Sequence, residues 1–146
     1  MPLIVVLDTN VIVRAQINAT SWSARIFDAF LEGRFDLAVS DSILQEVGGI
    51  LRKPNVRSCT GLSDEEIDEL VLLIRELATL TADLYDVRAV RDDPDDDKFL
   101  TCALESSANY VVSLDETHLL SMKTFRLLDY QVEIIDPERF VRVLET

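Results

Sequence analysis

Two short apolar segments of this chain end on an aspartate. Residues 3–10 read LIVVLDTN and place Asp8 after an apolar run, and residues 110–120 read YVVSLDETHLL and place Asp115 in the same way. If both runs are parallel strands, both carboxylates lie at the carboxyl edge of the sheet, where open α/β folds bind ligands. Carboxylate oxygens are the ligands that Mg²⁺ prefers, so these two residues suggest a divalent-cation site.

Each aspartate also has a simpler explanation. Asp8 is suited to cap a helix that begins near Thr9 or Asn10, and Asp115 is suited to cap the short turn ETHLL. Both readings stay open, but two carboxylates at equivalent strand ends favour a shared function.

A third acidic segment, DDPDDD at residues 92–97, contains five aspartates in six positions. Its simplest explanation is a solvated turn before a helix, where carboxylates favour the helix dipole. Helical periodicity distinguishes its members, because the following apolar stripe projects back almost onto Asp96. We therefore expect Asp96 to face the sheet, and Asp95 and Asp97 to face water. The stripe consists of Phe99, Leu100, Ala103 and Leu104.

Other metal-ligand sets find less support. A calcium loop of the EF-hand type is excluded because Lys98 takes the glycine position and no glutamate closes the loop. Zinc is disfavoured because His118 is the one histidine and the two cysteines, Cys59 and Cys102, form no metal-binding pattern. We interpret His118 as a surface or packing residue rather than a base. Glu46 flanks the apolar stripe of its predicted helix, where it either forms a salt bridge, lies at a solvated edge or reaches the carboxyl-end crevice.

Alternating strand and helix patterns predict an α/β fold. We expect a three-layer α/β/α sandwich with a mostly parallel sheet of four or five strands, in a single domain covering residues 1–146. Strands are predicted at residues 3–7, 35–39, 110–114 and 132–135, with a weak one near 80–84. Ser40 or Asp41 is expected to cap one helix, and SDEE at residues 63–66 forms a capping box for another. Residues 55–61, NVRSCTG, resemble a loop.

Composition narrows the function. The net charge is −13, so a basic footprint for coating nucleic acid is missing. An acidic chain can still act on nucleic acid if divalent cations screen an acidic pocket, or it can attract a basic partner. No apolar run is long enough for a membrane span and no signal peptide is evident, so we expect a cytoplasmic protein with reduced thiols. Nucleotide-binding glycine loops are also missing from the sequence.

Four motifs in order resemble the PIN-domain family of metal-dependent ribonucleases, and the toxin-like VapC (PilT N-terminus) members most of all. The resemblance covers nearly the whole chain. The motifs are VVLDTNV at residues 5–11, SDSILQEV at 40–47, DPDDDKFLTCA at 93–103 and VVSLDETHLL at 111–120. The final segment VEIIDPERFV at residues 132–141 is similar to the last strand and helix of the family. Asp97 replaces the asparagine usual in the third motif, and Glu116-Thr117-His118 replaces the usual second acid of the fourth.

This resemblance implies an endoribonuclease that uses Mg²⁺ or Mn²⁺. It assigns the catalytic and metal-binding acids to Asp8, Glu46, Asp96 and Asp115. Asn10 and Ser113 would orient the carboxylates, and phosphate contacts would come from Arg14, Arg52 and Lys98. The implied partners are the RNA substrate, a second copy of the chain in a homodimer, and an antitoxin protein that blocks the site.

Other functions remain as alternatives. A phosphoacceptor receiver domain would carry a lysine after its last strand, where this chain has IIDP, and a phosphatase of the D-x-D type would need an acid at Asn10. A catalytically inactive PIN-like binding or dimerisation module is the alternative outside the enzymes.

Overall fold

A six-stranded sheet forms the centre of the protein. The computed structural model describes residues 2–85 and 97–146, and its strands lie in the order β3-β2-β1-β4-β6-β5. Neighbouring strands are parallel except for the antiparallel pair β5 and β6. The strands are β1 (Ile4–Leu7), β2 (Asp36–Ser40), β3 (Thr79–Thr81), β4 (Tyr110–Val112), β5 (Thr124–Leu127) and β6 (Tyr130–Ile135).

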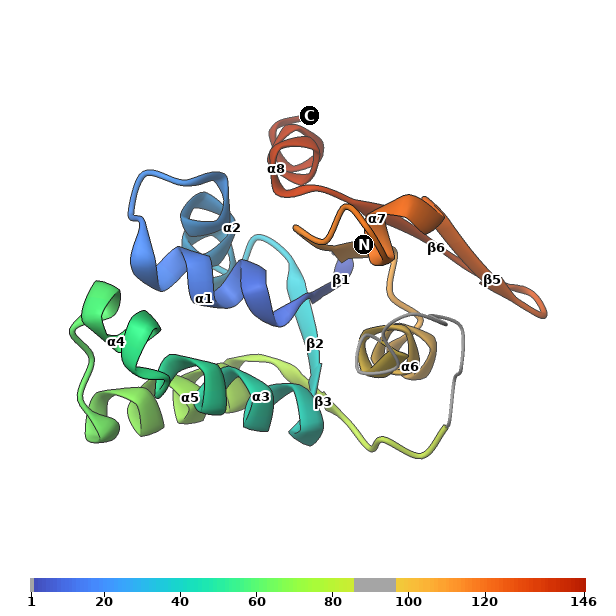
Figure 1. Ribbon diagram of the computed structural model, residues 1–146. Coiled ribbons are helices and arrows are strands. Elements are labelled where there is room, and N and C mark those ends of the chain that lie inside the picture. Colours follow the sequence, from blue (N-terminus) through green and yellow to red (C-terminus); the bar gives the residue numbers. More distant parts are fainter. Residues whose placement is uncertain (1, 86–96) are drawn as a thin grey trace.

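Helices cover both sides of this sheet. Helix α6 lies on one side against β1, β2, β3 and β4, whereas α1, α2 and α8 lie on the other (Figure 1). Helix α3 packs between α1 and α5 near the β2–β3 edge. The helices are α1 (Thr9–Ile17), α2 (Trp22–Leu31), α3 (Asp41–Leu51), α4 (Pro54–Thr60), α5 (Asp64–Leu77), α6 (Asp97–Ser106), α7 (Leu119–Met122) and α8 (Pro137–Glu145).

The structure confirms the predicted α/β class and the mostly parallel sheet. The sheet has six strands rather than four or five, because β5 adds an antiparallel strand beyond β6. The sequence TFRL of β5 buries one side chain, that of Phe125. Such a strand at the edge of a sheet carries no continuous apolar run that would reveal it.

The predicted loop at residues 55–61 is wrong, because most of it belongs to helix α4. Pro54 occupies the first helical position and Gly61 ends the helix in the left-handed conformation with φ of 69°. These are ordinary start and stop signals. Helix α4 buries none of its residues, so it shows no apolar stripe and periodicity could not reveal it.

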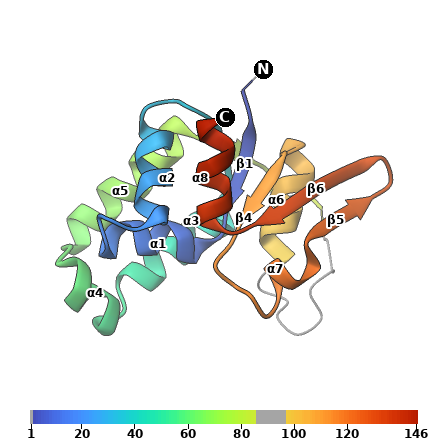
Figure 2. The same ribbon diagram turned by 90° about the horizontal axis from the view of Figure 1, so that it is seen from above.

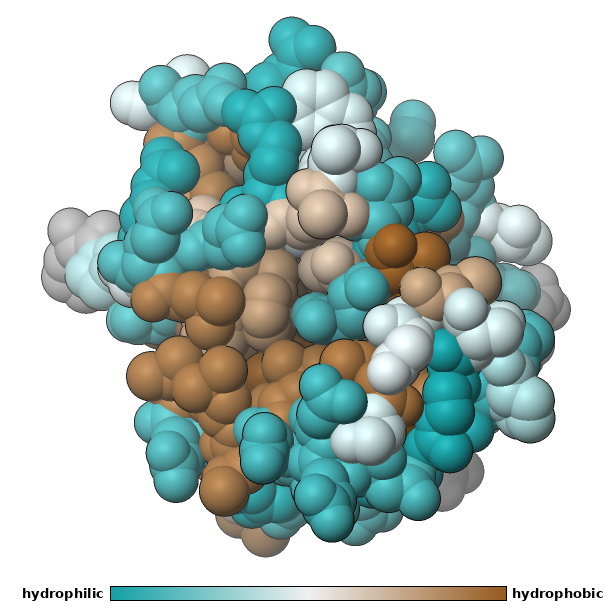
Figure 3. Space-filling model, turned by 90° about the vertical axis from the view of Figure 1, so that its left-hand side faces the viewer, coloured by the Kyte–Doolittle hydropathy of each residue, from teal (hydrophilic) through white to brown (hydrophobic). Residues whose placement is uncertain are grey.

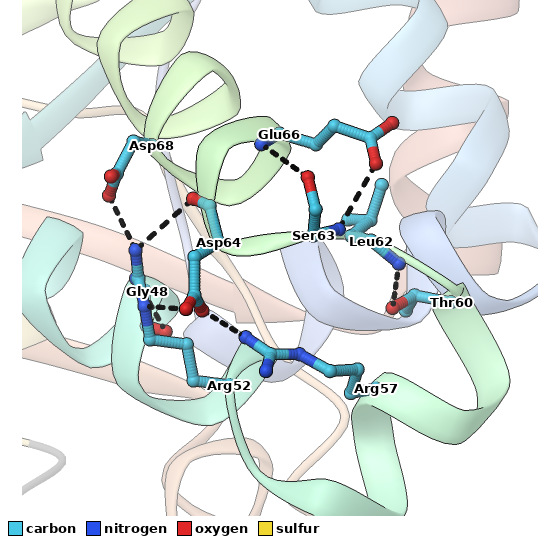
Figure 4. Close-up of polar contacts among 9 residues, drawn as sticks. All are labelled: Gly48, Arg52, Arg57, Thr60, Leu62, Ser63, Asp64, Glu66 and Asp68. Atoms are coloured by element: carbon cyan, nitrogen blue, oxygen red, sulfur yellow. Dashed lines mark hydrogen bonds and ion pairs between the residues drawn. The ribbon is translucent and has the colours of Figure 1, made fainter.

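Side chains cap the starts of helices α3 and α5. The Ser40 side chain accepts a hydrogen bond from the Ile43 amide at the start of α3. The predicted capping box of α5 is confirmed, since Ser63 and Glu66 each accept a hydrogen bond from the other's amide at 3.1 Å (Figure 4).

In the described part of the chain, no helix is both long and apolar enough to cross a bilayer.

The strand ends that concern function lie at one edge of the sheet. Figure 2 shows the start of α1, the loop between β4 and α7, and the start of α8 at this edge. Leu7 pairs with Val112, and Val112 pairs with Ile135. The residues that follow these three partners are therefore neighbours, as parallel register requires.

Candidate functional site

Asp8 occupies the centre of the candidate site. It follows β1 directly and caps α1, accepting a hydrogen bond from the Asn10 amide at 3.3 Å. Its own amide donates to the Val112 carbonyl at 2.8 Å, so the β1–β4 ladder continues to this residue. Asp8 is 3% exposed. The cap and the buried position occur together, so the capping explanation and a functional role are compatible.

Ser113 connects the two strand-end aspartates. It is fully buried, and its hydroxyl donates to Asp8 Oδ2 at 2.7 Å while accepting from the Asp115 amide at 2.9 Å. Asp8 and Asp115 are thus held on either side of one hydroxyl. The resemblance predicts that the Ser113 hydroxyl orients carboxylates, and the hydroxyl contacts one carboxylate, that of Asp8.

The electrostatics of Asp8 reveal neighbouring charges. Burial raises the pKa of the Asp8 carboxyl, and the negative charges of Glu46 and Asp115 raise it further. Hydrogen bonds from Ser113 and the Asn10 amide oppose the increase. The charges of Glu46 and Asp115 therefore both lie close enough to repel that of Asp8. A bound cation would relieve that repulsion.

Glu46 reaches the site from helix α3. Its Oε2 accepts hydrogen bonds from Thr9 Oγ1 at 2.8 Å and from Lys98 Nζ at 3.0 Å. The Glu46 side chain is 29% exposed and that of Lys98 is 20% exposed, so the ion pair is partly screened by water. Glu46 therefore forms the salt bridge that was one of its expected explanations, and its charge also acts on the Asp8 carboxyl.

Asp115 is held by the turn that follows it. Its Oδ1 accepts from the amides of Thr117 and His118, both at 3.2 Å, and its Oδ2 lies 3.0 Å from His118 Nδ1. His118 is thus a direct neighbour of a candidate metal ligand. Sequence reasoning interpreted it as a surface or packing residue, because its partner is recognised only when the turn is folded.

The third acidic motif is only partly described. Asp96, the acid that periodicity and the resemblance both selected, lies outside the described residues. Asp97 was predicted to face water, and this prediction is wrong because it is 9% exposed. Periodicity gives the angle of a side chain around its helix, but it does not tell which elements cover the first turn of that helix.

The remaining predicted residues are divided between the site and other surfaces. Asn10 contacts Asp8 through its backbone amide, while its side chain is exposed. Lys98 lies at the site, and Arg14 is exposed on α1 and lines a neighbouring pocket. Arg52 contacts neither the acids nor Lys98 among the described residues. Its guanidinium instead binds Asp68 at 2.5 Å and also Asp64, as Figure 4 shows.

Thr9 is a site residue that sequence reasoning missed. Its hydroxyl is buried and donates to Glu46, which lies 37 positions away in the chain. Its place directly after Asp8 was the available signal. The sequence marked it as the start of a helix, and its partner depends on how α3 packs against α1.

The donors at this site fit a hard divalent cation. Within residues 2–85 and 97–146, no three histidine, cysteine, aspartate or glutamate side chains are grouped to hold one ion. The predicted ligand set also includes Asp96, which lies outside those ranges. The described donors are the carboxylates of Asp8, Glu46 and Asp115, and the charges of the last two add to burial in raising the pKa of Asp8. Oxygen donors of this kind suit Mg²⁺ or Mn²⁺.

Comparison with known proteins identifies the family of this chain. Residues 4–117 match the family described as PIN domain, a range that includes Asp8, Glu46, Asp96 and Asp115. The chain is also 26% identical over 145 residues to an uncharacterized protein of Methanocaldococcus jannaschii, covering 97% of this chain and 91% of that protein. Since the family match covers well over half of the sequence, the chain belongs to the PIN domain family.

Proposed function

We propose that this protein is a metal-dependent endoribonuclease, built as a single PIN-like domain, that hydrolyses RNA phosphodiester bonds. The observation that carries the proposal is the Ser113 hydroxyl held between Asp8 and Asp115, with the charges of Glu46 and Asp115 raising the pKa of Asp8. Membership of the PIN domain family supports the same activity.

Each residue has a role that follows from its contacts. Asp8 and Asp115 bind the cation directly or through water, together with Asp96. Ser113 holds the Asp8 carboxylate and the backbone amide of Asp115 in place, a function that supporting residues serve at metal sites. Glu46 holds a water or accepts its proton, since its Oε1 accepts no hydrogen bond in the part of the chain that the structure describes.

A bound Mg²⁺ or Mn²⁺ supplies two effects, because it lowers the pKa of a coordinated water and balances charge on the phosphoryl oxygens. The protein's own cations serve the substrate. Lys98 forms an ion pair with Glu46 and can exchange this partner for a phosphate of the substrate. Arg14 lies farther along α1. Arg52 is committed to Asp68 and Asp64, so we assign phosphate contacts to Lys98 and Arg14 rather than to Arg52.

Labelled single-stranded RNA tests this activity. We expect the purified protein to cleave it internally in Mn²⁺ or Mg²⁺ and to lose all cleavage in excess EDTA, with activity restored when metal is returned. Binding of Mn²⁺ should also raise the melting temperature. At a Mn²⁺ concentration of a hundred times its Kd, binding stabilises the folded protein by about 2.7 kcal/mol. Cleavage that survives EDTA contradicts the proposal. Neither cleavage nor a shift in melting temperature would indicate the alternative, an inactive PIN-like module.

We further propose that the protein is the toxin of a toxin–antitoxin pair and forms a homodimer. An apolar surface supports an interaction partner. Leu72, Leu73 and Leu77 on α5 are 52%, 40% and 53% exposed. Figure 3 shows apolar side chains gathered on the face where α1, α4 and α5 lie. Exposed apolar patches of this kind mark interaction sites.

Sedimentation measures the homodimer directly. We expect a mass twice the 16.5 kDa of one chain at micromolar concentration. Leu73→Asp should shift the protein to the monomer, because a carboxylate on an apolar interface would be buried without a partner. Leu128→Asp is the matched control, since Leu128 is 91% exposed in the β5–β6 turn. A monomeric wild-type protein at this concentration would exclude the dimer.

A further inference from the structure

A pocket of about 510 Å³ lies beside the acids, within the size range of small-ligand sites. Leu114, which separates Ser113 from Asp115, forms part of its wall, and Asp136 follows β6 at the same edge of the sheet. Arg14 lines the pocket from α1, about 9 Å along the helix axis from Asp8 at 1.5 Å per residue. The pocket therefore adjoins the proposed site of cleavage.

Arg14 brings an uncommitted positive charge to this pocket. Its side chain is exposed and makes no hydrogen bond or ion pair within residues 2–85 and 97–146. The chain has 27 acidic and 14 basic residues, so most arginines have acids to pair with. Arg25, for example, binds Glu145 at 2.8 Å. A guanidinium left free beside an acid cluster is suited to bind a phosphate, because its planar donors match that group.

Trp22 provides an aromatic surface in the same pocket. It is the one tryptophan of the chain and is 39% exposed. The Arg25 guanidinium lies 4.8 Å from its ring centroid, and that guanidinium is held in turn by Glu145. The ring is therefore ordered before any ligand arrives. Nucleic-acid bases stack readily on an exposed ring of this kind.

A buried hydroxyl in the pocket wall lacks a partner. Ser23 is 2% exposed, and its Oγ has no hydrogen-bond partner among the described residues. A buried hydroxyl without a hydrogen bond destabilises the folded protein. A polar ligand atom or a water bound in the pocket would satisfy it.

The acids of the pocket wall are largely neutralised. Asp136 caps α8 by accepting from the Arg139 amide at 2.9 Å, and its Oδ2 lies 3.7 Å from Arg139 Nε, while Glu138 binds Arg142 at 3.1 Å. Among the described residues that line the pocket, Arg14 is therefore the charged residue without an ion-pair partner.

We propose that this pocket binds one nucleotide of a single-stranded RNA substrate, next to the bond that is cleaved. The base stacks on Trp22 and its phosphate binds Arg14. This inference rests on the proposed ribonuclease function and names its substrate class. Single-stranded RNA is favoured because only an unpaired base can leave its neighbours to stack on a side chain.

Tryptophan fluorescence tests the binding without catalysis. The Asp8→Asn protein in EDTA is titrated with a single-stranded hexaribonucleotide, with the same backbone lacking bases, with a free mononucleotide and with an RNA duplex. We expect saturable quenching that is strongest for the hexaribonucleotide, at least about fivefold weaker affinity for the abasic backbone, and little response to the duplex. Equal quenching by the abasic strand, stronger binding of the mononucleotide, or no quenching overturns the inference.

Steady-state cleavage in Mn²⁺ provides the second measurement. Trp22→Ala and Arg14→Gln should each raise KM about fivefold or more with little change in kcat, and Trp22→Phe should recover most of the loss because it keeps a ring. Arg126→Gln, which removes the same charge from β5, is the control and should leave KM unchanged. Unaltered KM in Arg14→Gln overturns the inference. Base-dependent quenching without any cleavage by the wild-type protein would instead refute the proposed activity and leave the pocket as a binding site.

Discussion

Replacing Asp8 with asparagine should lower Mn²⁺-dependent RNA cleavage by at least about 100-fold. Residues that merely support metal ligands already contribute about 10–100-fold, and Asp8 is the most central of the described acids. Asparagine keeps the size and the helix cap, so the loss comes from the missing charge. Initial rates of cleavage of a labelled RNA measure the effect. Activity within tenfold of wild type would remove Asp8 from the metal site.

The same variant should be more stable than the wild type when no metal is present. The wild-type carboxylate is buried against the charges of Glu46 and Asp115, and relief of such a conflict typically stabilises a protein by about 0.5–2 kcal/mol. Urea unfolding in EDTA at neutral pH measures the difference. Excess Mn²⁺ should reverse the order, because the cation stabilises the ionised wild-type site alone.

The raised pKa of Asp8 sets the pH dependence of that difference. The folded protein holds the Asp8 proton more tightly than the unfolded chain, whose ordinary value is 3.8. The protonated Asp8 carboxyl therefore contributes to the stability of the folded protein in full below pH 3.8, and this contribution is lost as the pH rises through the folded-state pKa. The stability advantage of Asp8→Asn should thus grow with pH above 3.8 in EDTA. An advantage that shrinks over this range would contradict the assignment.

Ser113→Ala should reduce kcat by about 10–100-fold, the range typical of residues that orient metal ligands. Removing the hydroxyl leaves Asp8 Oδ2 and the Asp115 amide without their partner in a fully buried position. Such losses destabilise a protein by about 1–3 kcal/mol. Single-turnover cleavage and urea unfolding together separate the catalytic loss from the loss of stability.

Ser40→Ala is the matched control for that variant. Ser40 is also fully buried and caps α3 through its hydroxyl, so its loss should cost about 1 kcal/mol. It makes no contact with Asp8 or Asp115 among the described residues, and its kcat should remain near that of the wild type. Equal losses in the two variants would show that Ser113 acts through stability alone.

Local signals in the sequence predicted much of the architecture. The run before Asp8 is apolar and β-branched, which predicts a buried strand, and SDEE at residues 63–66 is a capping box, which predicts a helix start. Such signals depend on neighbours in the chain, so they can be recognised without the fold. The sequence did not predict strand β5 or helix α4, because each buries few or no side chains and so shows little hydrophobic periodicity.

The sequence by itself determined that Asp8 and Asp115 follow two strands of a parallel sheet, because hydrophobic patterning and strand ends are local properties. Only the tertiary structure decided which residues contact them. Thr9 donates to Glu46 across 37 positions, Ser113 to Asp8 across 105, and Arg52 turns away to Asp68. Hydrogen bonds and ion pairs act over a few ångströms, so they depend on how distant segments pack, and no local pattern in the chain records that.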